Sequence, residues 1–447
     1  MTTFTVSIIG MGYVGLCTAV GFASKGNKVV TLDNNQEKVS SINKGISPFY
    51  EPGLDDLLQK SVKKGYLACI SDIKKAIQQS EITFISVGTP SKTDGSIDLK
   101  QIQDSVIEVG KALKTKNGYH LIIVKSTVVP GTTDSVVKPL LEKHSNKNCG
   151  SDFGLCMNPE FLREGSAVYD TLHPDRIIIG EYDKKSGDTL ETLYKNFHGQ
   201  DLPPIIRTNL PNAELIKYAN NAFLATKISY INTIANICEK IPGTDITTVA
   251  KAIGLDQRIN PKFLRAGLGY GGSCFPKDLK ALIHFSSQNS YNPLLLQSVQ
   301  NVNSDQAKRV VELVKNELGD LSNKKVAILG LSFKPNTDDM REARSIPIIT
   351  ELLSNGATVT AFDPIAVSNA KAIFKNKISY ASSVISCLKG ADCCIVVTEW
   401  EEFKKIKPED FTQNMSYPFL VDGRRIFVPE DFEHKLKFRA IGFGNSF

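Results

Sequence analysis

Residues 5–33 constrain the fold of this chain more than any other stretch. They read TVSIIGMGYVGLCTAVGFASKGNKVVTLD, in which two short apolar runs flank three spaced glycines and a helical stretch ended by Gly26. Each apolar run predicts a buried strand, and strands that alternate with helices are typical of a parallel sheet. The segment therefore predicts a β–α–β unit, the building block of a parallel sheet with helices on both faces.

The same alternation continues along the chain and then returns near its end. Further apolar runs that predict strands are ITFISVG, HLIIVKST and FGLCMNP, which begin at residues 82, 120 and 153. Alternation resumes near residue 324 with KKVAILGLSFKPNTDD, followed by ATVTAFDP and ADCCIVVTEW. We therefore expect a second, smaller α/β unit in the last third of the chain.

The middle of the chain predicts helices. Residues 212–240 contain neither Pro nor Gly, and their apolar residues recur at helical spacing over a wide arc. Such a long helix commonly buries one side in its own domain and the other against a partner. The chain to about residue 300 stays helical apart from the loop that contains Cys274, and a helix over 304–318 leads into the second unit. The predicted fold is α/β, with two doubly wound Rossmann-like domains (1–205 and 304–447) joined by a long central helix and a helical middle domain (206–303).

Composition excludes several classes of partner. The net charge of +6 comes from 53 basic and 47 acidic residues with no long basic block, so a small anionic ligand suits it better than nucleic acid. No run of eighteen apolar residues predicts a membrane span. The nine cysteines are an odd number without a C-x-x-C pair, so we expect neither a disulfide framework nor a metal site, and a reducing, cytoplasmic location.

The first glycine-rich turn predicts a dinucleotide site. In GMGYVG, Gly10 permits the tight turn, Gly12 lets the backbone approach a pyrophosphate, and Gly15 permits close helix–sheet packing. Asp33 ends the next strand, where a carboxylate accepts hydrogen bonds from a ribose and repels a 2′-phosphate, which favours NAD over NADP. The nearby Lys38 weakens that preference slightly.

The second α/β unit carries only Gly330 of the pattern, so we do not expect it to hold a second dinucleotide in the same way. Lys334, Arg341 and Arg344 place several cations near its strand ends, where ligands of open α/β sheets bind. A solvated loop explains any one of these cations equally well.

Cys274 lies in the stretch GYGGSCFPKD, between a glycine-rich run and a predicted helix. A thiol at a helix N-terminus favours the thiolate form, and a thiolate beside a hydride acceptor suits the oxidation of an alcohol through an aldehyde to a covalent thioester. Asp278 is four residues on, and Lys217 and Asn221 share a face of the long helix, where an ammonium and an amide could stabilise an oxyanion. The alternatives are a buried thiol that fills space and an exposed polar stripe.

Together these motifs resemble the UDP-glucose 6-dehydrogenase family of nucleotide-sugar dehydrogenases. The resemblance runs in the order of that family through GMGYVG, KSTVVPGT, NPEFLREGSA, ELIKYANNAFLATKISYIN, GYGGSCFPKD, SFKPNTDDMREA and DGRR, and covers nearly the whole chain. It implies oxidation of the C6 alcohol of UDP-glucose to the acid with two NAD, by dimers or larger assemblies built on the long central helix.

The resemblance also assigns residues. It makes Cys274 the nucleophile, Lys217 and Asn221 the oxyanion stabilisers, Asp278 with Thr127 the group that handles a catalytic water, and Glu160 an aid to hydrolysis. The positions implied to contact NAD are Gly10, Gly12, Tyr13, Val14, Gly15, Asp33, Lys38, Thr89, Thr127, Glu164, Lys277 and Arg341. The positions implied to contact the sugar nucleotide are Glu160, Phe161, Leu162, Arg163, Glu164, Lys217, Asn221, Arg258, Phe263, Leu264, Arg265, Ala266, Gly267, Gly271, Lys334 and Arg424. Of these, Arg258 matches an arginine that reaches into the site of a neighbouring subunit.

Three other functions stay open from the sequence. A sister enzyme acting on GDP-mannose or a UDP-N-acetylhexosamine shares the cysteine chemistry. A β-hydroxyacid dehydrogenase has a similar domain plan but takes one hydride and does not require Cys274. A catalytically silent NAD-binding regulator would lack the cysteine, lysine or aspartate at the motif positions, and all three are present.

Overall fold

The computed structural model describes residues 4–444. The contacts within the chain divide it into two compact units, one ending at Asn220 and one beginning at Asn221. This is a coarser division than the three predicted domains, whose boundaries stay a prediction.

The first unit is built on an eight-stranded sheet in the order β3-β2-β1-β4-β5-β6-β7-β8. Strands β1 to β6 pair in parallel, β7 runs antiparallel to β6, and β8 is parallel to β7. The strands are β1 (Thr5–Ile9), β2 (Lys28–Leu32), β3 (Leu67–Ile70), β4 (Ile82–Ile85), β5 (His120–Val124), β6 (Phe153–Met157), β7 (Ile177–Glu181) and β8 (Ile205–Asn209). The helices are α1 (Tyr13–Ser24), α2 (Gln36–Asn43), α3 (Leu54–Lys63), α4 (Ile73–Gln79), α5 (Lys100–Leu113), α6 (Lys138–Ser145), α7 (Ala167–Leu172) and α8 (Lys184–His198), with short turns η1 (Thr133–Val137) and η2 (Gly199–Asp201).

Both faces of this sheet are buried, because alternate residues of the central strands enter different hydrophobic clusters. Val6 and Ile8 of β1 pack in the cluster that includes α1, α3 and α8, whereas Ile9 packs in the cluster that includes α4, α5 and α6. The sheet is therefore doubly wound, as the strand–helix alternation predicted.

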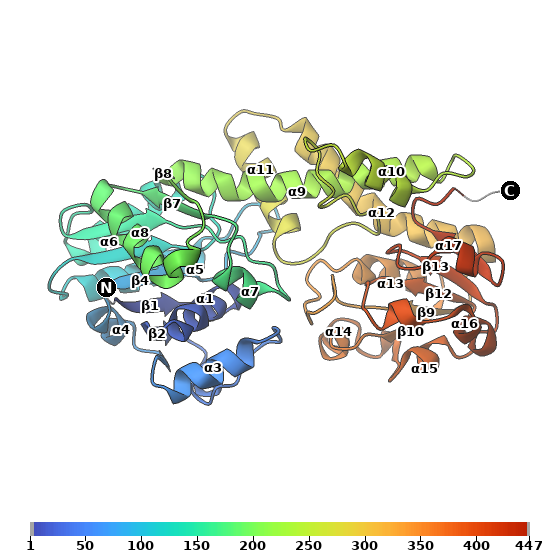
Figure 1. The fold of residues 1–447 in the computed structure, drawn as a ribbon, viewed down its shortest axis with the longest axis horizontal. Helices are drawn as coiled ribbons and strands as arrows, with labels where there is room; N and C mark the ends of the chain where they lie inside the picture. Colours follow the sequence, from blue (N-terminus) through green and yellow to red (C-terminus); the bar gives the residue numbers. More distant parts are fainter. Residues whose placement is uncertain (1–3, 445–447) are drawn as a thin grey trace. The chain divides into compact units, whose positions relative to one another are not determined.

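Helix α9 (Leu210–Cys238) is one uninterrupted helix of 29 residues (Figure 1). The boundary between the two units falls inside it, between Asn220 and Asn221. The prediction of 212–240 was correct to within two residues at each end, and Pro242 and Gly243 follow the helix where it stops.

The second unit contains a six-stranded parallel sheet in the order β11-β10-β9-β12-β13-β14. Its strands are β9 (Lys325–Leu329), β10 (Thr358–Phe362), β11 (Ser379–Tyr380), β12 (Cys393–Val396), β13 (Phe419–Asp422) and β14 (Lys437–Ala440). Its helices are α10 (Ile246–Gly254), α11 (Phe275–Gln288), α12 (Leu294–Leu318), α13 (Ser345–Ser354), α14 (Val367–Phe374), α15 (Val384–Leu388), α16 (Pro408–Asn414) and α17 (Pro429–Phe432), with short turns η3 (Lys375–Lys377) and η4 (Phe403–Lys405). Helix α12 begins ten residues before the predicted 304, directly after Pro293.

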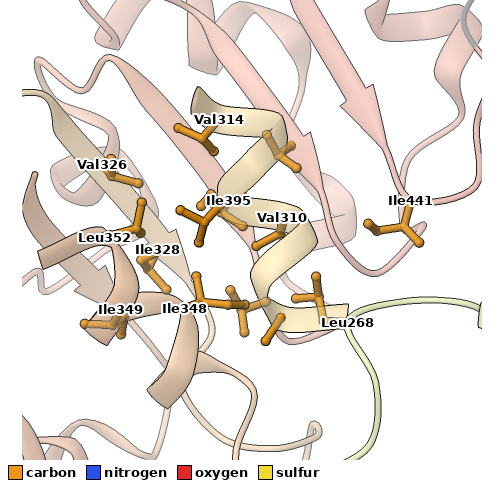
Figure 2. Packing of buried hydrophobic residues seen from close by; sticks show 14 of the residues in the cluster. Leu268, Val310, Val314, Val326, Ile328, Ile348, Ile349, Leu352, Ile395 and Ile441 are labelled. Carbon is orange, nitrogen blue, oxygen red and sulfur yellow. The ribbon is translucent and has the colours of Figure 1, made fainter. Parts of the chain in front are cut away.

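Helix α12 packs on this sheet through a close apolar layer. Figure 2 shows Val310 and Val314 of the helix beside Ile328 and Ile395 of the central strands, all four fully buried. Ala327 and Leu329 face the other cluster, with α15, α16 and α17. The second sheet is thus also covered on both faces, and none of the helices between residues 4 and 444 is long and apolar enough to cross a bilayer.

Candidate active site

In the glycine-rich turn between β1 and α1, a side chain would clash with the backbone at Gly10 and at Gly15 but not at Gly12. Gly10 has φ +94°, and a Cβ there would lie 2.9 Å from the Ser86 carbonyl oxygen. A Cβ at Gly15 would lie 1.9 Å from the Gly10 carbonyl oxygen. Gly12, the N-cap of α1, has no protein atom within 4 Å of its Cβ position. Packing therefore does not explain Gly12, whereas a ligand lying against the turn does.

Asp33 follows β2 directly and faces this turn. One carboxylate oxygen, Oδ2, accepts a hydrogen bond from the Met11 backbone N–H at 3.0 Å and lies 3.9 Å from Lys38 Nζ. Thr89 and Thr127 follow β4 and β5, and Thr89 Oγ1 donates to the Thr127 carbonyl at 2.9 Å. Tyr13 opens α1, with its ring 4.0 Å from that of Phe49, and Val14 follows it. A carboxylate beside an open, donor-rich helix start fits the ribose and pyrophosphate of NAD.

Lys217 of α9 is tied to Glu160, which follows β6. Lys217 Nζ donates to the Glu160 carbonyl oxygen at 2.7 Å and to Glu160 Oε1 at 2.9 Å, and both side chains are buried. Burial alone would raise the pKa of Glu160, but the Lys217 ammonium and the Leu162 N–H, which donates at 2.5 Å, outweigh it and hold that pKa below its usual value. The pair is therefore ionic at neutral pH.

A second buried ammonium lies in the same region, and sequence reasoning missed it. Lys125 directly follows β5 and donates at 3.0 Å to Asn158 Oδ1, which also accepts from the Tyr194 hydroxyl at 2.5 Å. Burial lowers the pKa of Lys125 to about 8, although Glu160 acts in the opposite direction. The sequence signal for this group is a lysine that directly follows the apolar run at residues 121–124.

The segment that follows Glu160 is fixed by partners within the first unit. Arg163 pairs with Asp170 at 2.6 Å, Phe161 lies under the Arg176 guanidinium at 3.9 Å, and Leu162 and Glu164 are half-buried. Glu51, which sequence reasoning also missed, accepts hydrogen bonds from the Gly165 and Ala167 backbones. The segment borders a cavity of about 170 Å³ that Lys125 and Glu160 also line.

Cys274 is the N-cap of α11, so its thiol lies at the start of that helix. The backbone N–H of Asp278 donates to the Cys274 carbonyl at 2.8 Å, which closes the first turn. The Asp278 carboxylate is buried and accepts from Asn221 Nδ2 at 2.6 Å and from Lys277 Nζ at 2.5 Å. Asn221 is one turn after Lys217 on α9.

The other predicted substrate positions of the second unit gather in part. Arg265 donates to the Arg424 carbonyl at 3.2 Å, and a Cβ on Gly267 would lie 3.1 Å from the Gly423 carbonyl. Leu264 and Ala266 are buried, while Phe263 is half-buried with φ +65°. Lys334 and Arg424 follow β9 and β13, at the carboxyl edge of the second sheet.

The side chains of two predicted residues are exposed and pair with nearby carboxylates. The Arg258 side chain is 89% exposed and pairs with Asp256. Arg341 is exposed and pairs with Asp339, although its carbonyl accepts from the Gly272 N–H, beside Gly271.

The second unit repeats the turn of the first with a different outcome. Gly330 has φ +98°, and Asp363 follows β10 as Asp33 follows β2. Asp363 Oδ2 accepts from the backbones of Leu331 and Ser332 and from Trp400 Nε1, while Oδ1 accepts from two further backbone N–H groups. Asp363 is only 2% exposed, and its carboxylate oxygens are hydrogen-bonded within the protein. It is therefore not accessible to the hydroxyl groups of a ribose.

The remaining candidate chemistry is limited. All nine cysteines are free, and only Cys149 and Cys274 are not buried. Within the part of the chain that the structure describes, no three His, Cys, Asp or Glu side chains are placed to hold a metal ion.

Comparison with known proteins decides the family. Three models of the UDP-glucose/GDP-mannose dehydrogenase family match the chain, its NAD binding domain over residues 4–198, its central domain over 211–305 and its UDP binding domain over 327–429. The chain belongs to this family.

Relatives span nearly the whole length of the chain. A UDP-glucose 6-dehydrogenase of Bacillus subtilis is 43% identical over 95% of this chain and 94% of its own length. A UDP-glucose dehydrogenase structure from Pyrobaculum islandicum superposes with a TM-score of 0.92 at 35% identity, covering 99% of this chain and 98% of its own. A UDP-D-ManNAc dehydrogenase from Pyrococcus horikoshii reaches 0.87 at 26% identity, covering 99% and 100%. As a member of this dehydrogenase family with its NAD binding domain, the protein is an NAD-dependent oxidoreductase.

Proposed function

We propose that the protein oxidises the C6 alcohol of UDP-glucose to the carboxylate of UDP-glucuronate in two steps, with Cys274 as the nucleophile. The observation that carries this proposal is Cys274 at the start of α11, one turn before a buried Asp278 that Asn221 and Lys277 hold. A one-step alcohol dehydrogenase has no use for such a thiol.

NAD, when bound, supplies the hydride acceptor for both oxidations. The positions proposed to bind it are those of the glycine-rich turn with Asp33, Lys38, Thr89, Thr127, Glu164, Lys277 and Arg341. The open space at Gly12 and the Asp33 carboxylate favour this assignment.

The residues of the chain divide the chemistry between them. In the first oxidation the C6 alcohol loses a hydride and a proton to give an aldehyde, and Asp278 with Thr127 orients a water that takes the proton. The Cys274 thiolate then adds to the aldehyde carbon, and Lys217 and Asn221 stabilise the resulting oxyanion. Loss of a second hydride leaves a thioester.

Hydrolysis completes the reaction. Water adds to the thioester carbon with Glu160 and Asp278 assisting, and the C–S bond breaks to return the thiolate and release the carboxylate. The sum is one UDP-glucose, two NAD and one water giving one UDP-glucuronate, two NADH and the released protons. The ionic Lys217–Glu160 pair supports both roles, because it supplies a charge for the oxyanion and a base for water.

The sugar nucleotide is assigned to the 160–164 and 263–267 segments with Lys217, Asn221, Gly271, Lys334 and Arg424. The match of the UDP binding domain to residues 327–429 supports the two residues at the carboxyl edge of the second sheet. Arg258 is assigned to the site of a neighbouring subunit, and its exposure supports that role. We further propose a homodimer, and the free cysteines support a reducing compartment, the cytoplasm.

The test counts NADH per sugar nucleotide over a panel of UDP-glucose, GDP-mannose and UDP-N-acetylhexosamines. We expect two NADH with UDP-glucose; preference for another sugar would favour a sister enzyme, and no turnover with any would favour a silent NAD-binding protein.

Cys274→Ser should give a burst of NADH and then stall with sugar attached to the protein, seen by intact-protein mass spectrometry, since an ester hydrolyses more slowly than a thioester. Cys149→Ser, the matched control, should turn over normally, whereas full turnover by Cys274→Ala would reject the nucleophile.

A further inference from the structure

The loop that leads to Cys274 is buried without belonging to a helix or strand. Residues 266–272 lie between α10 and α11, and every one of them is buried. Their backbone N–H and C=O groups therefore need partners from elsewhere, because an unpaired buried polar group is costly.

The backbone N–H and carbonyl of Gly267 both form hydrogen bonds with side-chain amides. Its N–H donates to Asn232 Oδ1 of α9 at 2.8 Å, and its carbonyl accepts from Gln306 Nε2 of α12 at 3.0 Å. Gln306 is itself oriented by Asn236 Nδ2, which donates to its Oε1 at 2.9 Å.

The backbone N–H and carbonyl of Tyr270 are both hydrogen-bonded to one side chain, that of Asn303. Its N–H donates to Asn303 Oδ1 at 2.7 Å and its carbonyl accepts from Asn303 Nδ2 at 3.1 Å, so the carboxamide substitutes for a neighbouring strand. Gly269 has φ +93°, and a Cβ there would lie 2.4 Å from Asn303 Oδ1. The loop thus lies directly against this amide.

An apolar anchor lies between these two points. Leu268 is fully buried in the cluster under α12, near Val310 (Figure 2). The loop is therefore held on both sides of Leu268 by uncharged groups from α9 and α12.

We propose that Asn232, Asn303 and Gln306, the amide clamp, are positioning residues that set the place of Cys274. The clamp contacts end at Tyr270, four residues before the thiol, and α11 begins immediately after it. A carboxamide donates and accepts at once, and it adds no charge beside a thiolate. The effect on turnover rests on the proposed role of Cys274, but the anchoring of the loop does not.

The test compares Asn303→Ala and Asn303→Asp with Asn301→Ala, an exposed position on the same helix. Hydrogen exchange of the peptide 266–275 measures the loop, and we expect it to become about tenfold faster in Asn303→Ala, from the loss of one buried hydrogen-bond pair. We expect kcat for UDP-glucose to fall by about 10- to 100-fold, because displacing a reacting group by 1 Å has that effect. NAD affinity should be unchanged.

The aspartate variant supplies a readout that general destabilisation would not give. Its carboxylate keeps the acceptor for the Tyr270 N–H but loses the donor to the Tyr270 carbonyl. Protonation restores that donor, so the activity of Asn303→Asp relative to wild type should rise as the pH falls, while that of Asn303→Ala should not. This variant also decides the matter if Asn303→Ala does not fold.

Exchange and kcat equal to those of Asn301→Ala, or no recovery of Asn303→Asp at low pH, would overturn the clamp. Faster exchange in Asn303→Ala together with full turnover by Cys274→Ala would leave the anchoring intact and reject the proposed nucleophile instead. The two failures are therefore distinguishable.

Discussion

His120 shows how a single buried side chain makes the stability of this fold depend on pH in the acid range. It lies at the start of β5, fully buried, with Nε2 2.7 Å from Thr83 Oγ1 and with the cations Lys116 and Lys147 as its charged neighbours. Burial, reinforced by Lys116, lowers the pKa of His120 to about 3. The folded protein therefore keeps this imidazole neutral where the unfolded chain takes up a proton.

The sign of the pH effect follows from that difference. The contribution of His120 to stability is constant above about pH 6.5, falls as the pH drops toward 3, and levels off below that value. At pH 5 the loss amounts to about 2 kcal/mol relative to pH 7. We expect His120→Gln to lose less stability than wild type between pH 7 and 5, by about that amount, in chemical denaturation.

His434→Gln, at an exposed histidine, is the control for the loss of a histidine side chain as such. An unchanged slope in His120→Gln would show that the unfolded and folded states bind the same number of protons at this site.

At the scale of elements, the turn before α1 contains two kinds of glycine. Close packing requires glycine at Gly10 and Gly15, whereas Gly12 has free space around its Cβ position. Gly15→Ala should lower the free energy of unfolding by about 3 kcal/mol, because its Cβ would collide with the Gly10 backbone. Gly12→Ala should leave stability unchanged within about 0.5 kcal/mol, because its Cβ meets nothing. We expect Gly12→Ala to weaken NAD binding by at least about tenfold, since the proposed pyrophosphate site lies there.

Thermal unfolding and NAD titration by calorimetry measure the two effects separately. Wild-type NAD affinity in Gly12→Ala would contradict the placement of the pyrophosphate, and wild-type stability in Gly15→Ala would contradict the packing.

Regular elements were predictable because their signals are local. The spacing of apolar residues alone gives α9 and most strands, and GMGYVG gives the start of α1. The amide clamp was not predictable, because Asn232 and Asn303 are 71 positions apart and read as ordinary polar residues on helices. The buried contacts of Lys125 and Glu51 were not predictable for the same reason, because their hydrogen-bond partners come from segments distant in the sequence.

At the scale of the whole molecule, α9 exposes an apolar stripe. Leu215, Phe223, Tyr230 and Ile237 recur every seven or eight residues and are 43%, 64%, 54% and 50% exposed. Such a stripe is typical of a helix that packs against a second copy. We expect light scattering to give twice the 49.0 kDa chain mass for wild type, and the single-chain mass for the double variant Phe223→Glu/Tyr230→Glu.

Ile385→Glu tests the specificity of that result, because Ile385 is 44% exposed on a different helix, α15. It should keep the wild-type mass. A wild-type mass in the double variant would place the contact between copies elsewhere, and an active monomeric wild type would reject the shared site assigned to Arg258.

The two glycine turns differ in how NAD binding affects the stability of the fold. Asp363 is saturated by internal donors, so the second turn holds its shape with or without a ligand. Gly12, in contrast, has open space at its Cβ position, where the proposed pyrophosphate site lies. NAD therefore adds its binding free energy to the folding equilibrium of the first unit, by RT ln(1 + [NAD]/Kd), and adds nothing through the corresponding turn of the second. The level of the oxidised cofactor therefore contributes to the stability of the folded enzyme through the first glycine turn and not through the second.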